Sequence, residues 1–233
     1  MSDTPETLTI GIPMYPGVDP LDVVAPYEVF DWMSSTVAGQ RSIRAYLLAE
    51  SHAPVNARTG ITLFPHRAFH EVEKLDVLWV PGGDPAALNV LMQGGVYLDY
   101  VKKWAADAAY VCSVCEGAML LAAAGLLDGF RATTHWAFYP CLESFPQIKV
   151  VPPKKGKYPR FIMDPQKPKP GQRGIRLTGG GISSGLDEAL RLVELLTDTA
   201  TAEDVQRNIQ YFPDPPVNAT LPPPPNCFLQ LPS

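Results

Sequence analysis

Short apolar runs alternate along this chain with segments of helical periodicity, and this alternation is the feature that most constrains the fold. Several runs end in Gly or Pro, as strands that enter tight loops do. Helices between successive strands favour a mostly parallel sheet with helices on both faces. The predicted strands are Leu8–Met14, Ile43–Ala49, Val77–Val80, Tyr110–Val114, Arg131–Thr134 and Gly174–Thr178. The predicted helices are Asp22–Met33, Ala86–Met92, Val96–Ala108, Ala118–Ala124, Ser184–Leu196 and Ala202–Tyr211.

The length and the placement of proline predict how the chain is organised. A chain of 233 residues can bury one sizeable core, so we expect a single α/β domain over residues 1–233. The 25 prolines are concentrated in two stretches, Pro152–Pro170 and Pro213–Pro232. Proline cannot donate to a strand ladder and it stops helices. We therefore expect an irregular insertion at about 152–172 and an irregular C-terminal tail at about 212–233.

Charge and hydropathy argue against several kinds of partner. A net charge of −5 argues against nucleic acid and against an anionic membrane surface. No apolar run approaches the length of a membrane span. The N-terminus, MSDTPETLTIG, lacks the basic region and apolar region of a signal peptide. We therefore expect a cytoplasmic location, no membrane partner and four cysteines that are free thiols.

Two of the cysteines, Cys112 and Cys115, have the C-x-x-C spacing of redox pairs and zinc sites. In an extended strand their Cα atoms would lie roughly 10 Å apart, whereas a disulfide needs them within about 7 Å. A zinc site needs convergent ligands, but His135 stands alone, and Cys141 and Cys227 are remote in sequence. We expect Cys112 to pack as a small apolar residue and the chain to hold no metal.

Cys115 lies where a predicted strand turns directly into a predicted helix. The small residues Gly117 and Ala118 follow it, as the crowded backbone of a strand–nucleophile–helix turn requires. A helix N-terminus also lowers the pKa of a nearby thiol and favours the reactive thiolate. A buried structural cysteine is the alternative, but the position beyond the strand end favours a nucleophile.

Ligands of parallel sheets bind beyond the carboxyl ends of the strands, so the neighbouring loops supply the remaining candidates. Gly82 and Gly83 follow a strand and let backbone N–H groups approach a ligand closely. We expect the N–H groups of Gly83 and Glu116 to point toward one pocket with the sulfur. Gly181 belongs to a similar glycine run and either lines the site or allows close packing.

Two side chains near these loops have an ordinary structural interpretation beside a catalytic one. Asp22 begins a predicted helix and is either its N-cap or a buried acid that hydrogen-bonds the Cys115 sulfur and delivers a proton. His135 follows a predicted strand. It either forms structural hydrogen bonds or supports the site from the side.

Together these motifs resemble the ThiJ/PfpI superfamily and, within it, the isonitrile hydratase branch. The resemblance covers nearly the whole chain, through motifs in the same order. The motifs are the Leu21-Asp22 pair within 16–26, Pro81–Gly83, Ser113–Gly117, Ala132–Trp136, Leu177–Ile182 and Gln210–Pro216.

The resemblance implies a flavodoxin-like (class I glutamine-amidotransferase-like) three-layer α/β sandwich that forms a homodimer. It implies that Cys115 is the nucleophile and Asp22 the acid. It further implies cofactor-independent hydration of a small isonitrile to the N-substituted formamide, for which a thiolate attack on the electrophilic carbon would form a thioimidate. Two alternatives share every motif: a glyoxalase-like enzyme acting on dicarbonyls, and a cysteine redox sensor.

One position departs from that branch, whose hydratases carry Thr where this chain has Glu116. An inward carboxylate would raise the pKa of the neighbouring thiol. An outward one would point to solvent and interact favourably with the helix dipole. Protease-like members place His after the nucleophile, so Glu116 also argues against peptidase activity.

Overall fold

A mostly parallel sheet forms the centre of the computed structural model, which describes residues 7–165 and 174–232. All neighbouring strands are parallel except β10, which runs antiparallel to β11. The seven strands lie in the order β10 (Phe161–Asp164), β11 (Ile175–Gly179), β7 (Tyr110–Ser113), β6 (Val77–Val80), β1 (Leu8–Pro13), β2 (Ile43–Ala49) and β5 (Arg67–Ala68).

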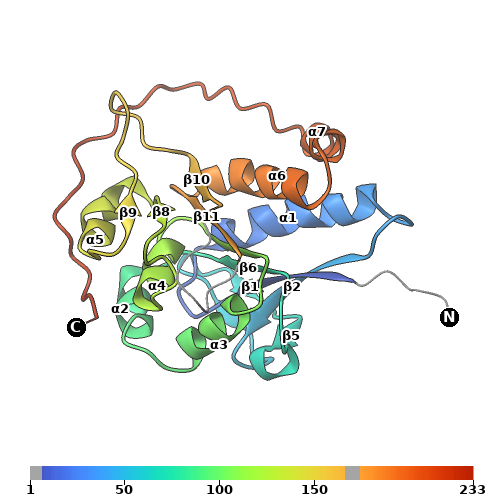
Figure 1. Cartoon of the computed structure of the whole chain (residues 1–233), viewed down its shortest axis with the longest axis horizontal. Helices are drawn as coiled ribbons and strands as arrows, with labels where there is room; N and C mark the ends of the chain where they lie inside the picture. The colour runs from blue at the N-terminus through green and yellow to red at the C-terminus, as the bar shows by residue number, and fades with distance from the viewer. Residues whose placement is uncertain (1–6, 166–173, 233) are drawn as a thin grey trace.

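Helices cover both faces of this sheet, which gives the three layers of the predicted α/β sandwich (Figure 1). One face carries α1 (Pro20–Thr36), α6 (Ser184–Leu196) and α7 (Thr199–Asn208). The other carries α2 (Pro85–Leu91), α3 (Val96–Ala105) and α4 (Gly117–Ala123), with α5 (Tyr139–Glu143) packed beside α4. The small elements are β3 (Val55–Asn56), β4 (Thr62–Leu63), β8 (Arg131–Ala132), β9 (Lys149–Val150), η1 (Phe69–Glu71) and η2 (Trp136–Phe138).

The sheet order brings together the loops that the sequence singled out. β1, β6, β7 and β11 are consecutive neighbours, and Val80 of β6 lies beside Ser113 of β7. The carboxyl ends of these four strands therefore lead side by side into the loops that carry Asp22, Gly82, Cys115 and Gly181. All four residues of β6 are buried, as expected for a central parallel strand covered on both faces.

Most predicted elements are confirmed, with shifts of a few residues at their ends, and two predictions differ from the structure. The predicted strand Arg131–Thr134 is only β8, which pairs with β9 outside the main sheet. β10 lies within the proline-rich insertion, which we expected to be irregular. The rest of that insertion includes residues 166–172, which lie outside the described part of the chain. The division into one domain stays a prediction.

The expectation of four free thiols is wrong for Cys141 and Cys227, which form a disulfide with a Cα–Cα distance of 4.6 Å. The residues are 86 positions apart, so only the tertiary fold brings them together. Cys112 and Cys115 are free, as predicted, and both are buried, which was expected for Cys112 but not for Cys115.

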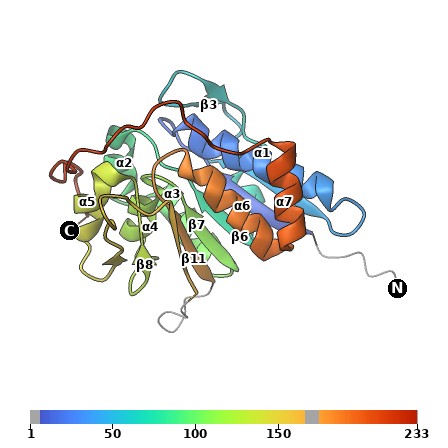
Figure 2. The ribbon, with the colours of Figure 1, turned by 90° about the horizontal axis from the view of Figure 1, so that it is seen from above.

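The C-terminal tail is irregular over its described residues, 212–232, as predicted. From α7 it crosses the molecule to the side that carries α5 (Figure 2). The disulfide joins it to α5, and Phe228 packs on Phe138 with ring centroids 5.0 Å apart. Among the described residues, no helix is long and apolar enough to cross a bilayer.

Candidate active site

Cys115 lies in the turn between β7 and α4 with a strained backbone, as the nucleophile interpretation predicted. Its φ of 55° falls in the left-handed region that non-glycine residues seldom adopt. Two hydrogen bonds hold it there: its N–H donates to Gly180 O at 2.8 Å, and the Thr134 hydroxyl donates to its carbonyl at 2.8 Å. This strand–helix turn at Cys115, here called the elbow, is therefore held by the loop after β11 and by the segment after β8.

Gly117 allows this turn to pass close to the end of β6. A Cβ at position 117 would lie 2.0 Å from the Val80 carbonyl oxygen, which belongs to fixed backbone. The glycine therefore confirms the sequence argument that small residues must follow the nucleophile.

Asp22 is not the N-cap of α1, because Asp19 has that role. The Asp19 carboxylate accepts the Leu21 N–H at 3.1 Å and pairs with Arg58 at 2.8 Å. Asp22 lies in the first turn and is fully buried, and its Oδ2 accepts the Gly82 N–H at 2.9 Å. Its Oδ1 has no hydrogen-bond partner among the described residues. The Gly82 N–H therefore already donates its hydrogen bond to the Asp22 carboxyl.

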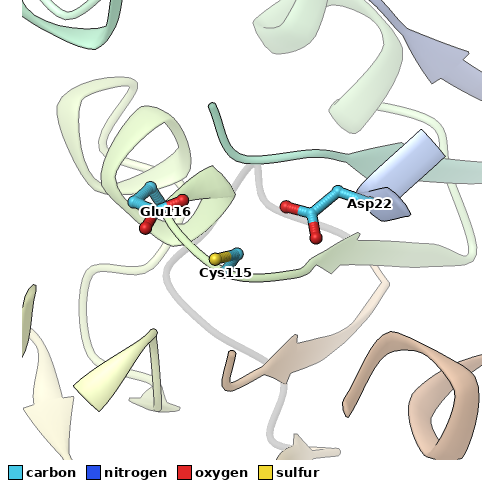
Figure 3. Close-up of side chains that lie close together, drawn as sticks. All are labelled: Asp22, Cys115 and Glu116. Atoms are coloured by element: carbon cyan, nitrogen blue, oxygen red, sulfur yellow. The ribbon is translucent and has the colours of Figure 1, made fainter. Parts of the chain in front are cut away.

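Glu116 points inward, with only 8% of the residue exposed. A Cβ at position 82 would lie 2.4 Å from Glu116 Oε2 and 3.0 Å from Asp22 Oδ2. The missing side chain of Gly82 therefore makes the room that both carboxyl groups occupy. Asp22 and Glu116 approach the sulfur from two sides (Figure 3), and ligand atoms of the three side chains lie within 4.8 Å of one another.

Burial raises the pKa of all three of these acidic groups, since the charged forms lose their hydration. The pKa of Cys115 lies well above its ordinary value because of burial, then because of the charges of Asp22 and Glu116. Burial and then the charge of Glu116 also raise the pKa of Asp22 well above its ordinary range. The increase for Glu116 is again caused first by burial, and its hydrogen bond with the Cys115 thiol opposes it.

These three residues are also the group whose spacing could hold a metal ion in the described part of the chain. The sequence pattern does not reveal this group, because Asp22 is far from Cys115 and Glu116 in the chain and joins them only in the fold. Ligands of these types bind a metal ion in their deprotonated forms, whereas burial holds the pKa of Cys115 and of Asp22 well above their ordinary values, so the cluster is a poor donor set for a metal ion.

The other predicted site residues lie around this cluster in supporting positions. The Glu116 N–H donates to the Cys115 sulfur, an interaction that lowers the thiol pKa and opposes the larger effect of burial. Gly83 packs against the first loop, where a Cβ would lie 2.5 Å from Gly17 O. His135 Nδ1 accepts the Ala137 N–H at 3.3 Å and caps η2, and its Cδ2 lies 3.0 Å from where a Gly181 Cβ would stand. A catalytic role for His135 and Gly181 stays a prediction.

The sequence prediction missed two further residues of the site. The Thr134 hydroxyl anchors the elbow carbonyl, as described above. Tyr15 follows β1, is buried, and donates its hydroxyl to Pro81 O at 3.2 Å. Burial raises the Tyr15 pKa well above its ordinary value, and the charges of the acidic cluster add to this effect. Its position after a strand end is the cue that could have identified it.

A cavity of about 710 Å³ lies beside the residues that hold Cys115 in place. Thr134, Gly180 and Gly181 line it, together with residues 219–221 of the tail. The tail therefore lines a space next to the residues that hold Cys115 in place.

A parallel sheet with a buried cysteine at a strained strand–helix turn defines a class of α/β proteins, and comparison with known proteins gives the family. The DJ-1/PfpI family model matches residues 9–150. The chain is 38% identical to an isonitrile hydratase of Pseudomonas putida over 215 residues, which are 92% of this chain and 83% of that protein. This chain belongs to the DJ-1/PfpI family.

Solved structures agree with this assignment. A ThiJ/PfpI family protein from Pseudomonas syringae has a TM-score of 0.77 at 31% identity, covering 92% of this chain and 79% of that one. DJ-1beta of Drosophila melanogaster has a TM-score of 0.70 at 16% identity, covering 88% of this chain and 98% of that one. The latter similarity bears on the fold alone.

Proposed function

We propose that this chain hydrates a small isonitrile to the N-substituted formamide, with Cys115 as nucleophile and Asp22 as acid. The observation that carries the proposal is the buried Cys115 at a positive φ with the Asp22 carboxyl beside it. The 38% identity to the isonitrile hydratase of Pseudomonas putida supports this reaction over others known for cysteine nucleophiles.

The reaction would run through a covalent intermediate. The Cys115 sulfur attacks the terminal isonitrile carbon, and the Asp22 carboxyl gives that carbon a proton. This forms the thioimidate R–N=CH–S–Cys115, and the proton that the thiol gives up goes to the substrate nitrogen when water adds. Water then adds to the same carbon, the C–S bond breaks, and the formamide R–NH–CHO leaves. One water is consumed, and Cys115 and Asp22 return to their starting states.

The raised pKa of Asp22 suits it to the first proton transfer. A carboxyl that stays protonated near neutral pH can act as a general acid. Its Oδ2 is held by the Gly82 N–H, which leaves Oδ1 as the atom able to carry the proton.

The same environment argues against a redox sensor. Oxidation of cysteine follows exposure and thiolate character. Cys115 is 2% exposed, and burial holds its pKa well above the ordinary value. A sulfur of this kind reacts with a ligand that enters the site more readily than with bulk peroxide.

Formamide production from an alkyl isonitrile tests the proposal in wild type, Cys115→Ala and Asp22→Asn. Cys115→Ala should show no turnover above background, because it lacks the nucleophile. Asp22→Asn should lower kcat by about 10²- to 10⁴-fold, the usual contribution of a general acid. Cys112→Ala is the matched control, since Cys112 is the other free buried thiol. An inactive wild type that turns over a dicarbonyl would replace this reaction with the glyoxalase-like one.

We also propose that the active form is a homodimer. Leu21 and Val24 flank the buried Asp22 on α1 and are 48% and 44% exposed. A second copy would cover this apolar surface. The cytoplasmic location stays a prediction.

A further inference from the structure

We propose that Glu116 is a second catalytic acid–base group, which accepts the Cys115 thiol proton as sulfur attacks and later returns it to the substrate nitrogen. This inference rests on the proposed hydration. It also gives a function to the residue at which this chain differs from the hydratases that it resembles.

The position of the Glu116 carboxyl supports this role. Its oxygen and the Cys115 sulfur belong to a cluster of ligand atoms that all lie within 4.8 Å of one another. The carboxyl fills the space above Gly82 and is largely excluded from solvent. A buried carboxylate this close to the sulfur can reach the thiol proton through a small side-chain rotation.

The charges around the cluster indicate which groups hold protons at rest. Asp22, Cys115 and Tyr15 are the groups that burial and mutual repulsion hold most strongly in their protonated forms. Burial raises the pKa of Glu116 first of all, and the charge of Asp19 adds to this, while the neighbouring thiol and the positive charge of Arg58 lower it; the pKa increase is smaller than those of Asp22 and Cys115. We infer a resting site with a neutral thiol, a neutral Asp22 and a Glu116 carboxylate.

The protons then balance through the whole cycle. In the first half, Glu116 takes the thiol proton, sulfur bonds to the isonitrile carbon, and Asp22 gives its proton to that carbon. In the second half, the Asp22 carboxylate removes a proton from water as the oxygen adds to carbon, and Glu116 gives its proton to nitrogen. Collapse breaks the C–S bond, the hydroxyl proton passes through Glu116 to sulfur, and the starting state returns.

This division explains why two carboxyl groups lie beside one sulfur. Asp22 starts with a proton and ends the first half without one, while Glu116 does the reverse. Each group is therefore in the correct state for the next step without exchange with solvent, which a buried site makes slow. A single carboxyl would have to exchange with water between the halves.

Glu116→Gln tests the proposal through two measurements that should move in opposite directions. The background is Cys112→Ala, in which Cys115 is the one titratable thiol because Cys141 and Cys227 are bonded. The first measurement is the pH titration of the Cys115 thiolate by its ultraviolet absorbance. Removing the neighbouring negative charge should lower the midpoint. The second is formamide turnover, which should fall about 100-fold or more.

The matched controls are Glu203→Gln on the surface of α7, which should change neither measurement, and Glu116→Asp, which keeps a carboxyl and should keep part of the turnover. If the midpoint falls and turnover rises or stays unchanged, Glu116 only holds sulfur protonated, and the proposal is overturned. If wild type does not turn over isonitriles, the proposed hydration is refuted, and only the thiol titration then tests whether Glu116 interacts with the Cys115 sulfur. An unchanged midpoint then overturns the proton contact, and a lowered one supports it.

Discussion

Removing the Cys141–Cys227 disulfide should lower the stability of the fold by an amount set by the loop that it closes. The cysteines are 86 residues apart, and the loop contains β9, β10, β11, α6 and α7. For a loop of this length, the chain-entropy model gives about 4.6 kcal/mol, near the upper end of what native disulfides contribute. A loss of that size would shift the melting temperature of a chain this long by roughly 10 °C.

Urea unfolding of wild type, with and without reductant, measures this loss against the double variant Cys141→Ser/Cys227→Ser. The reduced wild type and the double variant should share one midpoint, well below that of the oxidised protein. The m-value, which is the slope of the free energy of unfolding against urea concentration, should also be larger without the disulfide, because an unlinked unfolded chain exposes more surface. Reductant should not move the double variant, because Cys112 and Cys115 are already free. A double variant as stable as the oxidised wild type would refute the reasoning.

Two further predictions concern buried groups near the site. Gly82→Ala should abolish formamide turnover, because the new Cβ would lie 2.4 Å from Glu116 Oε2 and 2.7 Å from Glu116 N; wild-type turnover would contradict this. Burial raises the pKa of Glu188 well above its ordinary range. The folded protein therefore keeps a proton that the unfolded chain loses. As the pH rises from the unfolded-state pKa of Glu188 to its folded-state pKa, the free energy of unfolding of wild type should fall by up to about 1.4 kcal/mol per pH unit. Glu188→Gln should lack this slope in urea unfolding from pH 5 to 8, and parallel curves for the two proteins would contradict the prediction.

The elements that could be predicted from the sequence are those whose pattern reflects local burial. β2, β6 and α6 have the predicted bounds because β6 is buried on both faces and α6 is amphipathic. β10 could not be predicted, because prolines surround Phe161–Asp164 and no tight-turn signal connects it to its antiparallel partner β11. The same limit applies to the disulfide, whose partners meet only through the tertiary path of the tail.

In the site, the sequence predicted the residues but not which way they point. Cys115 and Asp22 follow from strand ends in a parallel sheet, and the two side chains lie close together in the structure, while their catalytic roles stay predictions. The side chain of Glu116 had two open orientations, and the choice depends on the empty space above Gly82 from another loop. Thr134 was missed because its hydrogen bond to the elbow spans 19 residues and joins two loops that no local pattern connects.

The protonation of Cys115 shows why magnitudes matter in such a site. A helix N-terminus contributes about 0.3–1 kcal/mol, which is less than one pKa unit, since one unit corresponds to about 1.4 kcal/mol. Full burial can shift a pKa by up to about five units in the opposite direction. With Cys115 2% exposed and two carboxyl groups within 4.8 Å, burial outweighs the helix, and the thiol keeps its proton. The proposed attack on an isonitrile would then require a base near the sulfur, which is the role proposed for Glu116.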